Sequence, residues 1–222
     1  MKILITGGAG FIGSHLVDKL SNDNEVIVLD NLLRGSKLQN NNFNLINKNI
    51  KNLNDVKQSI KGCDIVYHLA AFLGVDEVAK NPIETMETEC IGTFNVINAA
   101  LENNVKKIIY ASTSGIYGKV DIDKAVEEDF QVSPSSSYAI AKRYNEIYLK
   151  SIYSERKLDN FSLRYFNIYG PRQDTRMVIP RFFNQALKGD DIIVYGNGMQ
   201  TRDFTFIDDT IEATVEIANK CK

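Results

Sequence analysis

The chain contains 222 residues, 44% of them hydrophobic and 24% charged, a balance that predicts a soluble globular protein with one large domain or one domain plus a fragment. Its formal net charge is -2 and its acidic and basic residues are interspersed, so it lacks the basic stripe that binding to DNA or RNA requires. We therefore expect no nucleic-acid partner.

Short β-branched runs alternate along the chain with longer helical patterns. The patterns predict strands over residues 2–6, 25–30, 63–70, 106–112 and 161–166, and helices over residues 11–21, 55–61, 82–103 and 137–157. This alternation is typical of a parallel sheet with helices on both faces, a doubly wound α/β fold of the Rossmann type. After Pro171 the sequence predicts a helix over 180–189, a strand over 192–196 and a last helix capped near Asp208.

Cysteine spacing and the N-terminal sequence bear on the cellular compartment. Cys63, Cys90 and Cys221 lie far apart, without the spacing of a disulfide framework or a zinc site, so we expect reduced cysteines and no metal. The first strand begins without a preceding signal peptide, and no stretch approaches the length of a membrane span. The cytoplasm is the expected location, with no membrane partner.

A glycine-rich loop, TGGAGFIGSH at residues 6–15, joins the first strand to the first helix. Gly7, Gly10 and Gly13 allow a tight turn, the approach of backbone N–H groups to a pyrophosphate, and close packing of the helix on the sheet. Asp30 ends the second strand, where a carboxylate accepts hydrogen bonds from the adenosine ribose and repels a 2′-phosphate. These features predict NAD rather than NADP. The alternatives are that Asp30 only caps a strand end and that Arg34 accepts a phosphate.

Seven further blocks follow the loop in order: DNLLRG at 30–35, YHLAAF at 67–72, IGTFNVINAA at 91–100, YASTSGIYG at 110–118, YAIAK at 138–142, RYFNIYGPRQ at 164–173 and TRDFTFIDD at 201–209. Over nearly its whole length the chain thereby resembles the extended short-chain dehydrogenase/reductase family. Within that family it resembles the NAD-dependent sugar epimerases and dehydratases, most closely the UDP-glucose 4-epimerase-like members. The resemblance implies a nucleotide-sugar enzyme with NAD as its cofactor.

The resemblance also implies which residues bind NAD: Gly7, Gly10, Phe11, Ile12, Gly13, Asp30, Asn31, Asn49, Ile50, Leu69, Ala70, Ala71, Ser112, Tyr138 and Lys142. Two positions depart from the family pattern. Asn49 stands where an aspartate often faces the adenine, and we expect it to keep that contact by a hydrogen bond. Glu89 stands where an asparagine usually precedes the GT pair, which leaves the role of that asparagine unassigned.

Tyr138 and Lys142, four residues apart, share one face of the predicted helix. The lysine ammonium and oxidised nicotinamide lower the pKa of the phenol, so Tyr138 is the expected base. Tyr153 and Lys157 repeat the spacing 15 residues later, roughly 22 Å farther along the helix, where a packing or interface role is expected.

Ser112 and Thr113 end the fourth major strand, at the carboxyl edge where ligands of open α/β sheets bind. Thr113 matches the Ser/Thr with which the family hydrogen-bonds the reacting sugar oxygen, although it can also be an ordinary strand residue. Dehydratases and decarboxylases of the family usually carry an acidic residue just after this threonine, whereas this chain has Ser114 and Gly115. The missing carboxylate favours epimerisation over elimination.

The resemblance implies sugar-nucleotide contacts from Ser112, Thr113, Tyr138, Asn167 and Arg202, although Arg202 can instead pair with Asp203 or Asp208. We expect a UDP-hexose 4-epimerase in which Tyr138 removes the O4 proton while hydride passes from C4 to NAD and back. The alternatives are a nucleotide-sugar 4,6-dehydratase or reductase and a noncatalytic NAD-binding scaffold.

Two further expectations concern assembly and extent. The two long predicted helices should pair with their copies in a homodimer, with apolar contacts from Tyr144, Ile147, Tyr148 and Ile152. The family normally continues past TRDFTFIDD into a further substrate lobe. We therefore expect residues 1–170 to form the NAD-binding domain and residues 171–222 a partial substrate lobe. Turnover by this chain alone should be weak or undetectable unless another chain supplies the missing part of the pocket.

Overall fold

Six parallel strands form the centre of the computed structural model, which describes residues 1–120 and 125–220 apart from the side chain of Val75. The strands are β1 (Lys2–Thr6), β2 (Glu25–Asp30), β3 (Asn44–Asn47), β4 (Ile65–His68), β5 (Lys107–Thr113) and β6 (Asp159–Tyr165). Their spatial order is β3-β2-β1-β4-β5-β6, and every neighbouring pair is parallel. This order confirms the doubly wound Rossmann fold.

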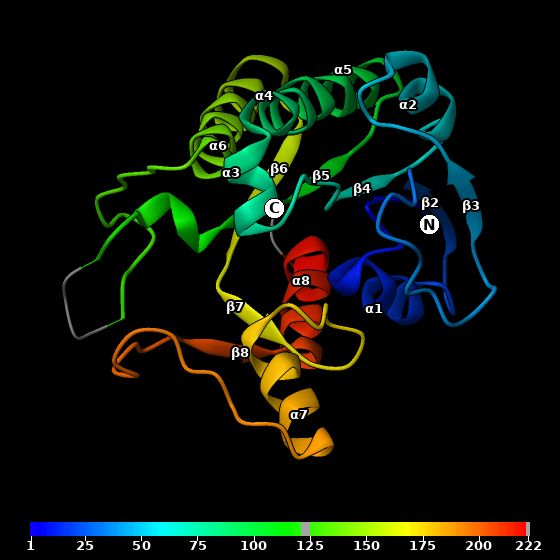
Figure 1. Ribbon diagram of the computed structural model, residues 1–222. Coiled ribbons are helices and arrows are strands. Elements are labelled where there is room, and N and C mark those ends of the chain that lie inside the picture. The colour runs from blue at the N-terminus through cyan, green and yellow to red at the C-terminus, as the bar shows by residue number, and fades with distance from the viewer. Residues whose placement is uncertain (121–124, 221–222) are drawn as a thin grey trace.

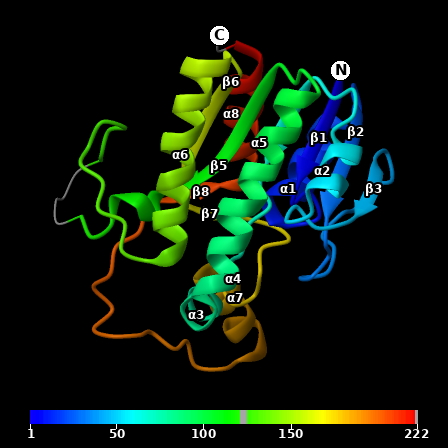
Figure 2. The same cartoon turned by 90° about the horizontal axis from the view of Figure 1, so that it is seen from above.

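One face of the sheet is covered by α2 (Leu53–Ser59), α5 (Thr93–Glu102) and α6 (Ser137–Arg156). Figure 2 shows α5 and α6 lying next to each other over this face. The opposite face is covered by α1 (Phe11–Leu20) and α8 (Ile207–Lys220), as Figure 1 shows. Side chains alternate between the two faces along a strand, so Leu4 packs in the first layer and Ile3 and Ile5 in the second. The near-continuous apolar strands of the sequence follow from this two-sided burial.

The helix expected over residues 82–103 is present but changes its winding twice. It consists of α4 (Pro82–Met86), the π-helical turn η1 (Glu87–Gly92) and α5, and it follows the short α3 (Val75–Lys80). A β-carbon on Gly92 would lie 2.5 Å from Cδ1 of Ile50, so any larger residue there would require the Ile50 side chain to shift. The wider π turn and this close approach occur together.

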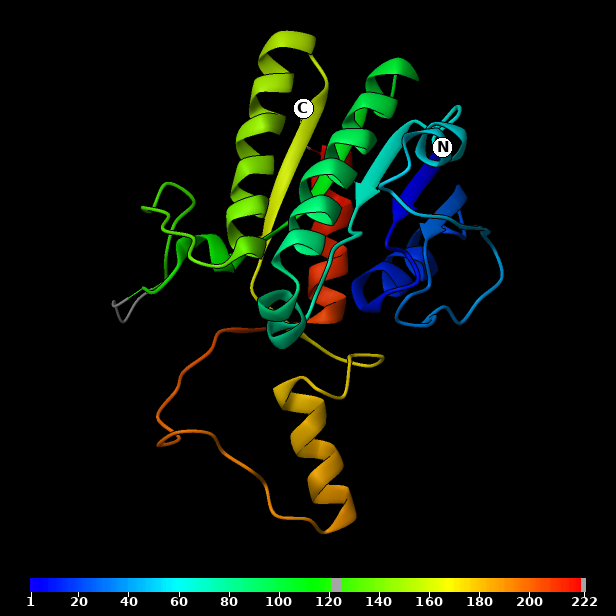
Figure 3. The same ribbon diagram turned by 45° about the horizontal axis from the view of Figure 1, so that its top comes forward.

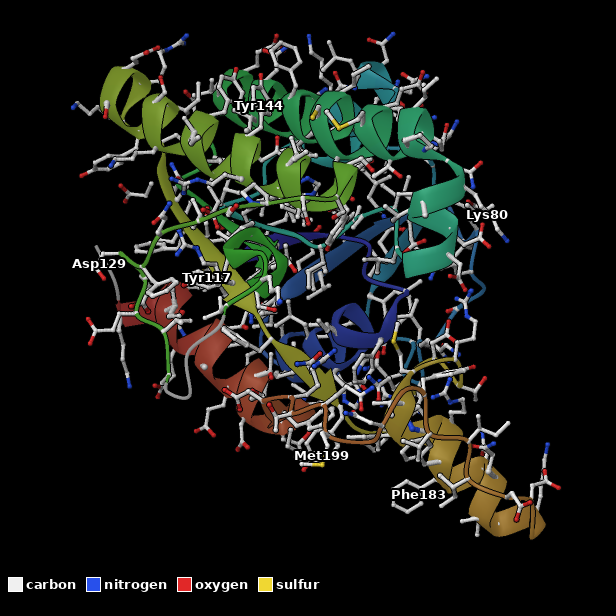
Figure 4. The ribbon with its side chains drawn as sticks, turned by 60° about the vertical axis from the view of Figure 1, so that its left-hand side comes forward. Lys80, Tyr117, Asp129, Tyr144, Phe183 and Met199 are labelled. Atoms are coloured by element: carbon white, nitrogen blue, oxygen red, sulfur yellow. The ribbon has the colours of Figure 1, made fainter. Side chains whose placement is uncertain are left out.

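Helix α6 begins where the side chain of Ser136 accepts a hydrogen bond from the Ala139 N–H, and it ends at Lys157 in the left-handed region with φ 59°. Ile152 faces the sheet and is only 6% exposed within the core. The expectation that Ile152 contributes to a dimer surface is therefore wrong, because Ile152 lies on the inner face of this helix. Tyr144 and Ile147 are exposed on its outer face, and Figure 4 shows Tyr144 there.

Residues after β6 form a small second sheet of β7 (Asn167–Tyr169) and β8 (Phe204–Phe206), with α7 (Val178–Lys188) between them in sequence. Helix α7 ends at Gly189 with φ 74°. Figure 3 shows α7 and the segment after it extending away from the main sheet, and Figure 4 shows Phe183 pointing outward from α7.

The strand expected over residues 192–196 is absent, so that prediction is wrong. Its β-branched residues are exposed, and no strand within residues 1–120 and 125–220 pairs with them. Helix α8 then returns to the main sheet, packs against α1 and β5, and buries Ile207 and Ile211. Although α8 follows residue 170 in the sequence, it therefore packs with the layers that were expected to bind NAD. In the described ranges no helix has both the length and the apolar character needed to cross a bilayer.

Candidate functional site

The glycine loop lies at the carboxyl end of β1 and requires glycine at two positions. Gly7 has φ 70°, and a β-carbon there would lie 2.6 Å from the backbone nitrogen of Ala70. A β-carbon on Gly13 would lie 2.3 Å from the carbonyl oxygen of Gly7. Gly10 caps α1 with no side chain, so it leaves the first N–H groups of the helix, from Phe11 onward, to other acceptors. This cradle fits a pyrophosphate at the positive end of a helix.

Asp30 fixes the next part of this edge. One carboxylate oxygen accepts a hydrogen bond from the Ala9 N–H at 3.0 Å and the other from the Leu32 N–H at 2.8 Å. Burial raises the pKa of Asp30 above its ordinary value of 3.8, although both backbone bonds act in the opposite direction. Each carboxylate oxygen retains a second lone pair, so Asp30 can cap the strand and also accept ribose hydroxyls. Asn31 is exposed beside it, and the Arg34 guanidinium donates to the Leu73 carbonyl.

Two turns complete the cofactor edge. After β3, the Asn49 side chain accepts from the Lys51 N–H at 2.9 Å, and buried Ile50 packs under Gly92. After β4, the turn of Leu69, Ala70 and Ala71 is tied to β1, because the Leu69 N–H donates to the Thr6 carbonyl at 3.0 Å. All these residues follow parallel strands and therefore lie along one edge of the sheet. The cradle, the carboxylate and the turns together fit a dinucleotide such as NAD.

The end of β5 meets the start of α6 near this edge. Thr113 caps the short 3₁₀ turn η2 (Ser114–Tyr117), accepting a hydrogen bond from the Gly115 N–H at 3.1 Å. A β-carbon on Gly115 would lie 3.4 Å from Oγ1 of Thr113 and 3.7 Å from Cβ of Ala139, the neighbour of Tyr138. Gly115 thus lies between Thr113 and the start of the helix that carries Tyr138. Ser112 is buried, and its hydroxyl donates to Glu146 at 2.6 Å, so its proton is committed there.

Glu146 joins a network that supports η2. Its carboxylate contacts Nε of Arg164 at 3.1 Å, and Nη1 of Arg164 donates to the Tyr117 hydroxyl at 2.9 Å. Tyr117 belongs to η2, and Figure 4 labels its position there. The contacts hold η2 and the strand end beside it against β6 and α6.

Tyr138 and Lys142 lie in the first turns of α6. Nζ of Lys142 lies 5.4 Å from the ring centroid of Tyr138 and donates to the Ala111 carbonyl at 2.8 Å. Burial raises the pKa of Tyr138 to about 12, although the Lys142 ammonium acts to lower it. The alternative pair lies at the far end of the helix, where Tyr153 is 51% exposed.

A buried carboxylate beside Lys142 is the feature that sequence reasoning missed. Glu89, on η1, pairs with Nζ of Lys142 at 3.1 Å, and the two side chains are 0% and 1% exposed. The sequence shows only that Glu89 replaces the usual asparagine. The available signal was a carboxylate just before the IGTFNVINAA block, at the position where the family usually has an uncharged asparagine.

The two expected sugar-nucleotide contacts from the C-terminal part lie close together in the fold but are exposed. The Asn167 amide donates to the Asp203 carbonyl at 2.9 Å, and Arg202 immediately precedes Asp203. Within residues 1–120 and 125–220, no ion pair joins Arg202 to Asp203 or Asp208, so its guanidinium remains available.

Other expectations can be checked on the same residues. Cys63 and Cys90 are free thiols, and Cys221 lies outside the described residues. Among the described residues, no group of three or more His, Cys, Asp or Glu side chains is placed to hold a metal ion.

Comparison with known proteins identifies the family. The model of the NAD dependent epimerase/dehydratase family matches residues 3–222. A UDP-N-acetyl-alpha-D-glucosaminuronate decarboxylase of Bacillus cytotoxicus is 41% identical over 96% of this chain and 70% of its own length. The structure of a UDP-N-acetylglucosamine 4-epimerase from Methanobrevibacter ruminantium, in complex with UDP-N-acetylmuramic acid, matches with a TM-score of 0.94 and 35% identity, covering 100% of this chain and 74% of that one.

A UDP-glucose 4-epimerase of Thermus thermophilus in complex with NAD matches with a TM-score of 0.91 and 33% identity, over 98% of this chain and 74% of that one. Matches at this level over nearly the whole chain confirm the expected resemblance and exclude a mere likeness of fold. The chain belongs to the NAD dependent epimerase/dehydratase family, as an NAD-dependent enzyme of the extended short-chain dehydrogenase/reductase type.

Proposed function

We propose that this chain is a nucleotide-sugar 4-epimerase that acts on a UDP-hexose. The observation that carries the proposal is that the end of β5 meets the Tyr138–Lys142 pair at the start of α6, because Lys142 donates to the Ala111 carbonyl two residues before Thr113. The pair lies at the sheet edge that also carries the glycine loop. The similar 4-epimerase solved with a UDP-sugar derivative supports the substrate class.

Tyr138 takes the proton from the sugar hydroxyl and returns it. With a pKa of about 12, its phenol needs more positive charge than Lys142 supplies to become a base near neutral pH. Bound NAD supplies that charge together with a reversible hydride acceptor for C4 of the sugar. Thr113 uses its oxygen to cap η2, so its hydroxyl proton is free to hydrogen-bond the sugar oxygen and align it with the phenol.

The proposed NAD contacts follow one another along the carboxyl edge of the main sheet. The N–H groups at the start of α1 bind the pyrophosphate, Asp30 accepts ribose hydroxyls, and Asn49 hydrogen-bonds the adenine. Lys142 holds the ribose beside the nicotinamide. Ser112 contributes through its backbone, because its hydroxyl is bonded to Glu146.

Arg202 is the proposed diphosphate contact, with Asn167 beside it. A guanidinium matches the oxygens of a diphosphate in a fork-like arrangement, and Arg202 is exposed with no ion pair to its nearby aspartates. Both residues lie around the small sheet, Asn167 at the start of β7 and Arg202 just before β8, in the proposed substrate lobe. Only Arg202 falls within residues 171–222.

A nucleotide-sugar dehydratase or decarboxylase is the second candidate, because a decarboxylase is 41% identical. Elimination needs a proton donor or acceptor next to the reacting carbon. Ser114 and Gly115, which follow Thr113, provide no carboxylate. Epimerisation needs only the proton and hydride transfers already described, so it remains the preferred function.

We also propose a homodimer through the outer surface of α4, η1, α5 and α6. This surface exposes Ile83, Ile91, Phe94, Tyr144 and Ile147, whereas Tyr148 stacks between Phe94 and Tyr144. An open depression of about 460 Å³ between α4 and η1 is lined by Ile83, Met86 and Ile91 among others. So many exposed apolar side chains on two adjacent helices are typical of a helical interface. Sedimentation of a strict monomer at micromolar concentration would contradict the dimer, and Ile147→Glu should dissociate it.

Product analysis tests the enzymatic proposal. The purified chain with NAD is incubated separately with UDP-glucose, UDP-N-acetylglucosamine and UDP-glucuronate, and products are identified by NMR. The expected product is the 4-epimer with every oxygen and carboxyl group retained, and Tyr138→Phe is the inactive control. A product that has lost water or carbon dioxide would instead support the second candidate. Absence of any product with NAD bound agrees with the weak or undetectable turnover expected of this chain alone, so it supports neither candidate.

A further inference from the structure

Lys142, one member of the proposed catalytic pair, also forms an ion pair that is shielded from water. Oε2 of Glu89 lies 3.1 Å from Nζ of Lys142, and the two side chains are 0% and 1% exposed. Apart from this ion pair with Lys142, Oε2 has no hydrogen-bond partner in the described parts of the chain. The carboxylate oxygen and the ammonium therefore depend on each other for charge compensation.

Each member of the pair is also fixed to the backbone of a site element. The second oxygen of Glu89 accepts from the Phe72 N–H at 2.8 Å, directly after the Leu69–Ala71 turn on the cofactor edge. Lys142 donates to the Ala111 carbonyl at 2.8 Å, two residues before Thr113. The pair thus connects the cofactor turn, the end of β5 and the start of α6.

We propose that Glu89 is a positioning residue: it is the buried counter-ion that keeps Lys142 charged and fixes it between Tyr138 and the cofactor turn. The proposal rests on the proposed function in one respect, namely that Tyr138 and Lys142 are the working pair. Glu89 itself touches neither the reacting sugar nor the hydride path and acts through Lys142.

The charges around the pair support this role. Burial acts to lower the pKa of Lys142, but the negative charges of the Glu89 carboxylate and of an ionised Tyr138 outweigh it and raise the pKa above the ordinary value of 10.5. The titratable groups that interact with the pair from the surrounding elements are His68 on β4, Tyr110 on β5, Tyr138 on α6 and Cys90 on η1. Glu146, farther along α6, is already bonded to Arg164, Arg143 and Ser112. Among the described carboxylates, Glu89 is thus the one that can neutralise Lys142.

Glu89→Gln is the decisive variant, because it removes the charge and keeps both the side-chain length and an acceptor for Phe72. Glu87→Gln is the matched control: Glu87 lies on the same turn but pairs with Lys51 at the surface, at 3.2 Å. The readout is the titration of Lys142 in protein carrying lysine labelled with ¹³C at Cε, with the signal assigned by its loss in Lys142→Met. This titration needs no substrate.

We expect Lys142 to remain charged above pH 10.5 in the unaltered protein and in Glu87→Gln. In Glu89→Gln burial is no longer offset, so the ammonium-to-amine ratio at a given alkaline pH should fall at least about tenfold. Correspondingly, kcat should fall at alkaline pH in this variant alone, with KM for the sugar nucleotide little changed. If Glu89→Gln does not fold, Glu89→Asn, which installs the residue usual in the family, is titrated instead.

An identical Lys142 titration in the unaltered protein and in the folded Glu89 variant would overturn the proposal. Because the titration is read without turnover, it also separates the two hypotheses. A chain that shows the expected Lys142 shift but converts a UDP-sugar to a product that has lost water or carbon dioxide would contradict the proposed function and leave the role of Glu89 supported.

Discussion

His68 provides a sharp test of the buried polar layer beneath the site. Its ring lies at the end of β4, fully inside the protein, with Nδ1 at 2.6 Å from the Thr6 hydroxyl and Nε2 at 2.9 Å from the Thr93 hydroxyl. Burial, with the Lys142 ammonium as a second cause, lowers the pKa of His68 from 6.5 to about 3. The native protein therefore holds a neutral imidazole throughout the physiological range.

The lowered pKa makes stability depend on pH in a known direction. Between the two pKa values the unfolded chain binds the proton and the native protein does not, so the contribution of His68 is complete above 6.5 and is lost as the pH falls toward 3. The full interval corresponds to about 5 kcal/mol, and about 3 kcal/mol is lost by about pH 4.5. A loss of this size is a large fraction of the stability of a typical domain.

The assay compares urea unfolding of the unaltered protein and His68→Gln at about pH 7 and about pH 4.5. Carboxylates titrate in both proteins, so the difference between their pH dependences isolates His68. The variant should lose about 1–3 kcal/mol at neutral pH with its hydrogen bonds, yet lose less than the unaltered protein on acidification. The chain has two histidines, so His15→Gln identifies the His68 signal in an NMR titration. A His68 ring that titrates near 6.5 would refute the reasoning.

Three further outcomes are expected at the site. Tyr138→Phe should lower kcat by roughly 10²–10⁴-fold and leave the NAD Kd nearly unchanged, whereas Tyr153→Phe should retain full turnover. The opposite ranking would mean that Tyr153 and Lys157 are the catalytic pair. Asp30→Asn should narrow the preference for NAD over NADP by about tenfold in competitive titrations, because it removes like-charge repulsion of the 2′-phosphate, and an unchanged ratio would count against that role. Gly13→Ala places a β-carbon 2.3 Å from the Gly7 carbonyl oxygen. The substitution should weaken NAD binding and lower the free energy of unfolding by about 1–3 kcal/mol. Unaltered NAD binding in calorimetry would show that the loop tolerates the displacement.

The sequence allowed the main sheet to be predicted because its signals are local. Apolar runs mark β1, β2 and β5 to within a residue or two, and the glycine loop identifies the first turn of the fold. The strand expected at 192–196 failed for the opposite reason. Its apolar residues satisfy a local pattern, but a strand also needs a partner, and the described chain supplies none there.

The same distinction applies to the site. Tyr138 and Lys142 share a helix face, so their proximity follows from spacing alone. The partnership of Lys142 with Glu89 joins residues more than 50 positions apart through the packing of η1 on α6, and the inward side of Ile152 was likewise decided by packing. Such contacts depend on how a helix is rotated about its axis, which a periodic pattern specifies only coarsely.

The π turn η1 sets that rotation for the long helix of which it is part. A π turn holds one residue more than an α turn, and each residue advances an α-helix by about 100°. Deleting a single residue between Glu87 and Gly92 would restore regular α-helical winding. The deletion would then rotate one side of the turn. Either α4 would turn away from the surface where Ile83 and Ile91 line one depression, or Glu89 would turn away from Lys142. Substitutions in this stretch keep the number of residues, so they leave the rotation of α4 relative to α5 unchanged. A one-residue gap in an alignment of related sequences at η1 therefore indicates a changed outer surface or a changed lysine environment, even where every flanking motif is intact.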